Sequence, residues 1–243
     1  MTSHLIALDK VRHNLIKIKQ SQDFNQVKNQ NMSPISANEL ANSATSYPVF
    51  FIKDQDTGLF KLIALFGLEA GENLFYRDGK WLTHFVPNNI LRYPFAIGRS
   101  NTEQNTYSIF IDESSERVNE TEGLALYNED KSESDFLIYI NNLLKKIVED
   151  DFKTTQFINK LNELDLISPY TLTINKPNNE TLNIDGLYAI NQNQLNNLDV
   201  LYISPLTNYN DDDYTNEKSN NNDDNTVVET FLISDNTTIA TII

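Results

Sequence analysis

The densest group of residues that could do chemistry is a carboxylate cluster in the segment DESSERVNETEG, residues 112–123. Its acidic members are Asp112, Glu113, Glu116, Glu120 and Glu122. Carboxylates at the end of a strand can bind a divalent cation or supply a general acid and a general base. The segment lacks the alternation and central glycine of a calcium loop, and Arg117 can neutralise its acidic neighbours instead. We therefore expect no metal, and an enzyme that modifies a peptide or protein through Asp112, Glu113 and Glu122 is the alternative function.

Other common catalytic patterns are missing from the sequence. His4, His13 and His84 are far apart and do not form an HExxH zinc motif, and the chain has no GxSxG or glycine-rich phosphate loop. The chain also has no cysteine, which excludes disulfides, thiolate catalysis and cysteine-based metal clusters. The sequence thus predicts no catalytic residue and no cofactor.

The balance of charge argues against nucleic acid and lipid as partners. The 243 residues carry a formal net charge of −15, and residues 206–243 account for −7 of it with eight acids and one lysine. An acidic surface repels phosphate backbones and anionic lipids. No segment has the ~18 to 20 apolar residues of a membrane-spanning helix, and residues 1–20 lack the apolar region of a secretory signal peptide. We expect a protein or peptide partner, no nucleic acid, no membrane insertion and a cytoplasmic location; the sequence does not specify the oligomeric state.

A binding surface is predicted around the segment GLEAGENLFYRDGKW, residues 67–81, which contains the only tryptophan. Aromatic side chains occur here near both signs of charge, and aromatic and arginine anchors dominate protein interfaces. The alternative is that the rings form the core of a sheet and the charges form its solvated rim. The predicted binding residues are Glu72, Asn73, Trp81, Arg92 and Arg99.

Several β-hairpins are predicted from turn residues between apolar runs. Asp78-Gly79 is a two-residue turn signal, because both central positions of a type I′ turn require positive φ. Two longer hairpins follow the Tyr-Pro dipeptides at 47–48 and 93–94, and another spans 170–191 around the turn KPNNE.

The apolar spacing changes to that of a helix from Ser132 onward. The apolar stripe weakens in EDDFKTT, residues 149–155, and resumes at Phe157, which predicts either one long bent helix or two in succession. Ser132 and Asp135 can cap its start. Together the elements predict an α+β fold: an antiparallel, hairpin-rich sheet with one or two long helices, from about Ser132 to Leu164, packed on it.

A shorter helix is predicted upstream of the first long hairpin. Ser36 and Glu39 have the spacing of a capping box, in which each side chain bonds the backbone of the other residue. The helix must end before Pro48, because the residue that precedes a proline avoids the helical conformation.

Blocks of sequence resemble those of the SapC family of bacterial proteins. The blocks YPVFFIKD, LIALFGLEAGENLF, VPNNILRYPFAIGR, IDESSERVNETEGLALYNED and FINKLNELDLISP occur in the family's order, and the resemblance spans roughly residues 5–200. The family takes its name from genes linked to bacterial surface-layer proteins, so the resemblance implies a context and supplies no catalytic residue. It implies a non-enzymatic accessory or binding protein, linked to surface-layer or cell-envelope protein biogenesis, that binds a protein or peptide partner.

The predicted organisation is a single domain followed by a tail. Residues 1–205 form the α+β domain, residues 206–225 a disordered Asp- and Asn-rich linker, and residues 226–243 a β-prone tail. The end, NNNDDNTVVETFLISDNTTIATII, looks like the uncleaved C-terminal signal of type I export, in which a polar stretch precedes terminal apolar residues. The alternative location is therefore the cell surface or the medium.

Overall fold

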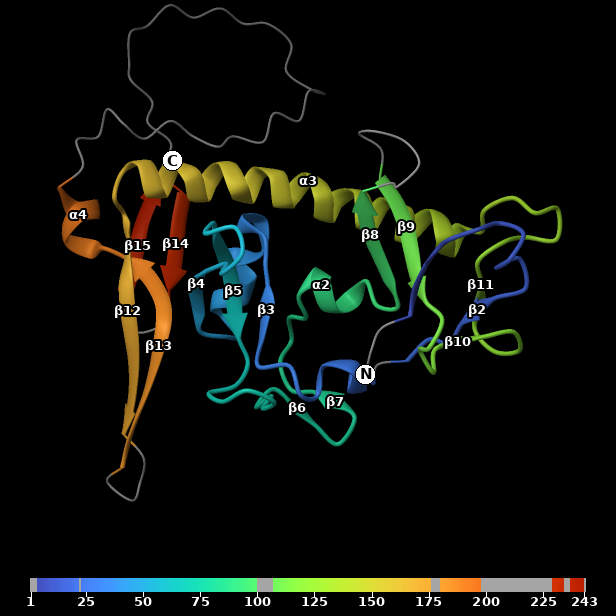
Figure 1. Cartoon of the computed structure of the whole chain (residues 1–243), viewed down its shortest axis with the longest axis horizontal. Helices are drawn as coiled ribbons and strands as arrows, with labels where there is room; N and C mark the ends of the chain where they lie inside the picture. The colour runs from blue at the N-terminus through green and yellow to red at the C-terminus, as the bar shows by residue number, and fades with distance from the viewer. Residues whose placement is uncertain are drawn as a thin grey trace, which may run out of the picture.

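One long helix organises the molecule. Helix α3 (Asp135–Glu163) has 29 residues and lies along one side of most of the strands (Figure 1). The structure is a computed structural model, and it describes residues 4–21, 23–99, 107–175, 180–197, 229–233 and 237–242. Of the two arrangements that the sequence left open, α3 adopts the single continuous helix.

The start of α3 is set one residue before the helix by Ser134. Its hydroxyl accepts a hydrogen bond from the Leu137 N–H at 3.1 Å, which satisfies one of the unpaired N–H groups of the first turn. The predicted caps, Ser132 and Asp135, are wrong. The Ser132 hydroxyl instead donates to Asp130 at 2.6 Å within the preceding turn, and Asp135 is the first helical residue.

The end of α3 is closed by a left-handed residue. Asp165 has φ 52°, and the Leu166 N–H donates to the Leu161 carbonyl at 2.9 Å. This pattern satisfies a carbonyl of the last turn, and it turns the chain directly into the strand that follows.

The largest sheet has five antiparallel strands in the order β12-β13-β4-β5-β3. Their bounds are β3 Met32–Pro34, β4 Val49–Lys53, β5 Phe60–Leu65, β12 Ile167–Asn175 and β13 Thr181–Ile190. The register pairs β13 with β4 only at Leu187↔Ile52 and Tyr188↔Phe51. The far end of the β12–β13 hairpin therefore projects from the body (Figure 1).

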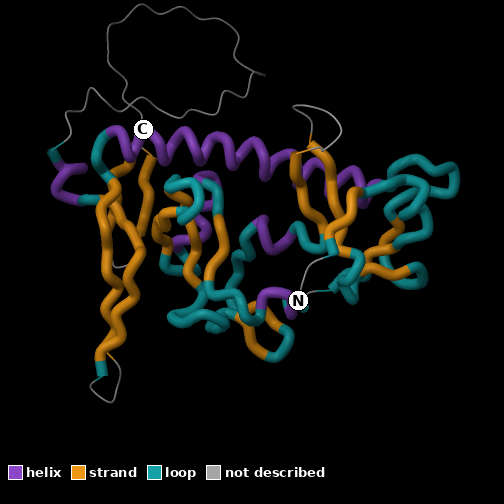
Figure 2. The backbone as a smooth tube through the Cα atoms, in the orientation of Figure 1, coloured by secondary structure: helices purple, strands orange, loops and turns teal. Residues whose placement is uncertain are grey.

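A second group of strands lies under the other half of α3 (Figure 2). One three-stranded sheet has the order β1-β9-β8, and the other has the order β10-β2-β11. Their bounds are β1 Leu5–Ala7, β2 Lys17–Ile18, β8 Phe95–Arg99, β9 Tyr107–Asp112, β10 Val118–Asn119 and β11 Leu124–Ala125.

Short elements connect and flank these sheets. They are η1 Asn25–Val27, η2 Ala37–Glu39, α1 Leu40–Ala44, β6 Tyr76–Arg77, β7 Lys80–Trp81, α2 Asn88–Leu91 and α4 Gln192–Asn196. Strands β14 (Glu229–Ile233) and β15 (Thr237–Ile242) pair with each other, and β14 lies against α1. The whole of the predicted linker, residues 206–225, lies outside the described residues, as do residues 226–228, 234–236 and 243 of the predicted tail.

The predicted hairpins are confirmed. Strands β4 and β5 pair after the first Tyr-Pro dipeptide, and β8 and β9 pair after the second. Asp78 and Gly79 have φ 52° and 79° in the turn between β6 and β7. The α+β class is also confirmed, with the difference that the strands divide into separate sheets. They divide because α3 presents two apolar segments, and a different sheet covers each one.

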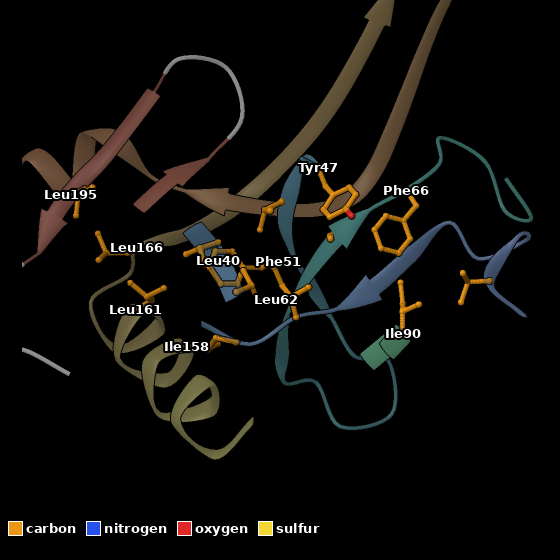
Figure 3. Close-up of a cluster of buried hydrophobic side chains, with 14 residues drawn as sticks. Leu40, Tyr47, Phe51, Leu62, Phe66, Ile90, Ile158, Leu161, Leu166 and Leu195 are labelled. Atoms are coloured by element: carbon orange, nitrogen blue, oxygen red, sulfur yellow. The ribbon is translucent and has the colours of Figure 1, made fainter. Parts of the chain in front are cut away.

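Two cores sit against α3, one under each half. The first core contains Ile158 and Leu161 of α3, which lie near Leu40, Phe51 and Leu62 of the five-stranded sheet and its neighbouring helix (Figure 3). The second core is built on the N-terminal half of α3. Its buried members are Ile18, Phe95, Ile111, Leu126, Tyr127, Leu137, Ile140 and Leu144.

We predict that the two cores unfold together, because α3 belongs to both. Leu144→Ala in the second core and Ile158→Ala in the first should each lower the free energy of unfolding by about 2–5 kcal/mol, the range for removing a buried branched side chain. Chemical denaturation followed by far-UV circular dichroism and by Trp81 fluorescence checks this. Coincident transitions are expected in both variants. Separate transitions for the two probes would show that the halves fold independently.

Candidate functional site

A groove of about 690 Å³ lies beneath the middle of α3, between the two groups of strands. Its residues come from β3 and the segment that follows it, the β4–β5 turn and β5, α2, the facing strands β8 and β9, and α3 above. In Figure 1, β3 and β8 are the neighbouring strands on the two sides of this space, and α2 lies between them. The groove thus forms where two sheets pack under one helix.

The rim of the groove carries large apolar side chains that are exposed to solvent. Leu59, Tyr107 and Phe152 line the groove and expose 57%, 55% and 65% of their surface. They come from the β4–β5 turn, β9 and α3, so three separate segments contribute exposed apolar surface to the groove. Exposed apolar groups gathered around a concavity are typical of a site that binds a ligand or a partner.

Of the positively charged side chains that line the groove, Arg92 is the one that forms no ion pair with a carboxylate of any described residue. Its Nε donates to Asn89 Oδ1 at 3.1 Å, and its Nη1 donates to the Phe95 carbonyl at 3.1 Å. Burial lowers the pKa of the Arg92 guanidinium, although the group remains charged. Two of its three nitrogens hold it in place, and its charge is left without a counter-ion from the described part of the chain.

A buried glutamate closes one wall of the groove. Glu39 Oε2 accepts from the N–H and the hydroxyl of Ser36 at 3.0 and 2.9 Å, which confirms the predicted capping box. Its Oε1 accepts from the Asn88 N–H at 2.7 Å. The carboxylate therefore joins η2 to the start of α2, and its oxygens are occupied by structural hydrogen bonds.

A buried aspartate holds α3 over the groove. Asp150 accepts from Asn38 Nδ2 at 2.7 Å and from Lys146 Nζ at 2.9 Å. One turn later, Thr154 Oγ1 accepts from the Ala37 N–H at 2.8 Å. The apolar stripe of α3 weakens in this part of the sequence, and these hydrogen bonds take the place of apolar packing there. They connect the helix to η2.

Trp81 belongs to an aromatic network that packs against the first core. Its Nε1 donates to the Tyr47 hydroxyl at 2.7 Å and to Thr83 Oγ1 at 2.9 Å, and its ring makes edge contacts with Phe24 and Phe66 at centroid distances of 5.8 and 5.2 Å. Burial raises the pKa of the Tyr47 hydroxyl, which donates to a backbone carbonyl nearby.

Two other predicted binding residues make contacts within the chain close to this network. Glu72 accepts from the Leu68 N–H at 2.8 Å. Asn73 is buried, donates to the Val27 carbonyl at 2.9 Å and accepts from the Phe75 N–H at 3.0 Å. These bonds shape the loop that precedes β6.

The structure thus separates the predicted binding residues. Arg92 lines the groove, whereas Glu72, Asn73 and Trp81 do not. The backbone of Arg99 ends β8, and its side chain lies outside what the structure describes.

The three acids of the alternative enzyme hypothesis are held by different partners. Asp112 is buried and accepts from the Ser114 hydroxyl at 2.6 Å. Glu113 forms a two-bond pair with Arg12 at 2.6 and 2.7 Å, and Glu122 forms an ion pair with Lys19 at 3.1 Å. Within the described ranges, no three His, Asp or Glu side chains come together in a way that could hold a metal ion.

The sequence contained one signal of the groove that the prediction did not use. Phe152 stands in the segment 149–155, where the apolar stripe of α3 weakens, and it is exposed and belongs to neither core. A large ring outside the buried face of a helix indicates a possible contact surface. The rest of the groove depends on how far apart the two sheets sit, and the sequence does not specify that distance.

We predict that the Arg12–Glu113 pair makes stability depend on pH. The hydrogen bonds from Arg12, and secondarily the contact of His13 Nε2 with Glu113 Oε1 at 3.0 Å, lower the pKa of the Glu113 carboxyl. A lowered folded-state pKa contributes stability above the unfolded value of about 4.3, and this contribution is lost as pH falls through the folded pKa. Glu113→Gln should therefore lower Tm at pH 7, and the difference from wild type should vanish in acid.

Thermal unfolding of both proteins between pH 7 and about pH 2.5 checks this prediction. Glu122→Gln is the matched control, because both side chains of the Lys19–Glu122 pair are exposed and exposed pairs contribute little. A Tm difference for Glu113→Gln that does not change with pH would contradict the role of the ion pair.

Comparison with known proteins supports the family resemblance. A protein-family model described as SapC matches residues 8–208, which is most of the chain. No curated protein and no solved structure matches the chain. None of the helices among the described residues is both long and apolar enough to cross a membrane.

Proposed function

The chain belongs to the SapC family, and from that premise we propose that it is a non-enzymatic binding protein that holds a segment of a partner protein in the groove beneath α3. We place the partner among surface-layer or cell-envelope proteins, the context that the family's name implies. The observation that carries the proposal is the groove of about 690 Å³ with exposed apolar side chains from three segments in its lining.

The groove suits a segment of chain better than a small metabolite. Its lining residues come from two sheets and from η2, α2 and α3, and the apolar groups of the lining that are most exposed, Leu59, Tyr107 and Phe152, are accessible to a longer ligand. Its buried acids, Glu39 and Asp150, are occupied by hydrogen bonds that hold the walls. They are therefore poor candidates for a general acid and base, which must be able to exchange protons with a substrate.

The enzymatic alternative receives less support from the same contacts. Asp112, Glu113 and Glu122 each bond a different neighbour, and the groove includes none of the three. A pair of catalytic carboxylates needs a shared substrate position within reach of both. We therefore develop the binding function.

We predict that Phe152→Asp weakens partner binding and that Tyr139→Asp does not. Both residues lie on α3 and are similarly exposed, at 65% and 59%, but only Phe152 lines the groove. A carboxylate in place of Phe152 removes an apolar contact and must be desolvated when a partner binds. The partner's affinity should fall about tenfold or more, since loss of an interface aromatic costs more than 1 kcal/mol.

The measurement uses the tagged full chain and its two variants as bait in extracts of the native cells. Quantitative mass spectrometry first identifies the proteins retained by wild type, and titration with the purified partner then gives each dissociation constant. Circular dichroism confirms that both variants are folded. Equal affinities of the two variants for the partner would sink the proposal.

The location of the protein is a second part of the proposal. We propose a cytoplasmic protein, with export through a C-terminal signal in residues 226–243 as the second candidate. Strands β14 and β15 form a hairpin from this region, and an unpaired β-hairpin can add to a sheet of another protein.

We predict that deletion of residues 226–243 leaves the protein in the cytoplasmic fraction. Immunoblots of cytoplasm, cell surface and culture medium from the native host check this prediction, with the full-length chain as the control. Full-length protein in the medium that disappears on deletion would establish the export signal instead. A cytoplasmic marker must stay inside in both strains, so that lysis does not imitate export.

A further inference from the structure

We propose that the groove binds an extended peptide segment as an added strand along β8, with a carboxylate of that segment on Arg92. This inference rests on the proposed function and specifies the chemistry of its ligand. The segment has alternating apolar side chains and one acidic group, from an Asp or Glu side chain or a chain end. Three features of the described residues carry it: the open edge of β8, the less open edge of β3 and the unpaired charge of Arg92.

The hydrogen-bond pattern of β8 shows which of its backbone groups are unused. The Asp112 N–H donates to the Pro94 carbonyl at 2.9 Å, and the register continues with Ala96↔Phe110 and Gly98↔Ser108. In an antiparallel ladder, alternate residues bond to one neighbour and the residues between them face the other side. The backbone groups of residues 95, 97 and 99 therefore face away from β9.

The other strand of this sheet confirms the assignment. On the far side of β9, the Leu8 N–H donates to the Ile109 carbonyl at 2.8 Å, and β1 continues that ladder. Thus the backbone groups of residues 109 and 111 of β9 face β1, and those of residues 108, 110 and 112 face β8. The odd-numbered residues of β8 are left with no partner strand among the residues that the structure describes.

Of these outward-facing residues, Phe95 has its backbone groups hydrogen-bonded and Ile97 does not, among the residues that the structure describes. The Phe95 N–H donates to the Arg92 carbonyl at 2.8 Å, and the Phe95 carbonyl accepts from Arg92 Nη1. Ile97 lines the groove, and its N–H and carbonyl have no hydrogen bond to any described residue. An open strand edge of this kind is a template for an added strand.

The strand on the opposite side of the groove, β3, is less open to the same pairing, because its outward carbonyls are already bonded. Pro34 has no N–H to donate, and its carbonyl accepts from Asn89 Nδ2 at 3.0 Å. The Met32 carbonyl accepts from Gln30 Nε2 at 2.7 Å. Proline and side-chain caps are the means by which edges are protected from pairing, so the added strand belongs to β8.

The charges that line the groove favour a carboxylate on Arg92. Glu39 and Asp150 accept structural hydrogen bonds, and Lys61 forms an ion pair with Asp54 at 2.5 Å. Asp151 also lines the groove and is exposed to solvent. Arg92 is then the charge available inside, and its guanidinium can donate to a carboxylate with two parallel bonds.

The position of Arg92 links the two parts of the ligand. Its Nη1 bonds to the carbonyl of Phe95, which stands two residues before Ile97 on the same edge. A strand paired at Ile97 therefore places a side chain or a chain end near Arg92 after about two residues, at ~3.3 Å per residue. Its alternate side chains would meet the apolar groups of the rim.

The test uses three fluorescein-labelled seven-residue peptides of alternating valine and threonine. The first ends in glutamate with an amidated C-terminus, the second has glutamine in its place, and the third is the first with N-methyl groups on alternate amides. Fluorescence anisotropy with the full chain measures binding. We expect the glutamate peptide to bind about tenfold more tightly than the other two, because one lacks the charge and one lacks the backbone donors.

Variants assign the effect to Arg92. Arg92→Gln should abolish the preference for glutamate over glutamine. The matched control is Arg117→Gln. Arg117 is also half-buried, bonds the Tyr93 carbonyl at 2.9 Å and has no carboxylate partner among the described residues, but it does not line the groove. It should retain the preference.

Hydrogen exchange of the wild-type chain provides a measurement that needs no variant. The Ile97 and Arg99 amides should exchange more slowly when the glutamate peptide is present, and the Ala96 amide, already in the ladder, should change little. Unchanged exchange at Ile97, or equal affinity for all three peptides, overturns the inference. If Phe152→Asp still loses the native partner in that case, the proposed function stands without this binding mode. If Phe152→Asp also binds the partner normally, both fail.

Discussion

The continuity of α3 over two separate cores is the constraint on which the rest of the structure depends. A helix of 29 residues is about 43 Å long, which is longer than either group of strands can cover. Each group buries one apolar segment of the helix. The space that remains between them is bridged by Asp150 and Thr154, which bond η2 rather than an apolar neighbour. The groove is therefore a consequence of one helix packing on two sheets, and this helix forms the upper wall of the groove.

The acidic character of the chain makes the interior of the groove unusual. The chain carries a formal net charge of −15, and the two buried acids that line the groove hold its walls through hydrogen bonds. Arg92 stands among them with its hydrogen bonds directed to an amide oxygen and a carbonyl rather than a carboxylate. A half-buried cation of this kind is tolerated because guanidinium is weakly hydrated and bonds neutral oxygens well. The same property leaves its charge available to a partner.

The two sheet edges that border the groove differ in how readily they can pair with another strand. Unpaired strand edges promote aggregation, and natural proteins usually block them. Here the outward carbonyls of β3 accept from side-chain donors and Pro34 has no N–H. The Ile97 backbone of β8 has no hydrogen bond to any described residue and lies beneath α3, within the groove. A sheltered edge is accessible to an extended segment and inaccessible to the flat edge of another folded sheet, which combines binding with protection.

Local structural features, by contrast, can be predicted from the sequence itself. The Asp78-Gly79 turn, the hairpins after both Tyr-Pro dipeptides, the Ser36–Glu39 capping box and the helical period after Ser132 each depend on residues close together in the chain, and the structure contains all of them. What the sequence by itself determined is therefore the α+β class and the family. Only the tertiary structure decided that the strands divide into separate sheets, that Trp81 and Asn73 bond within the chain, and that Arg92 meets Phe152 around one groove. The physical reason is distance along the chain: the walls of the groove come from segments more than a hundred residues apart, such as Asn38 and Asp150, and no local pattern records which distant surfaces will pack together.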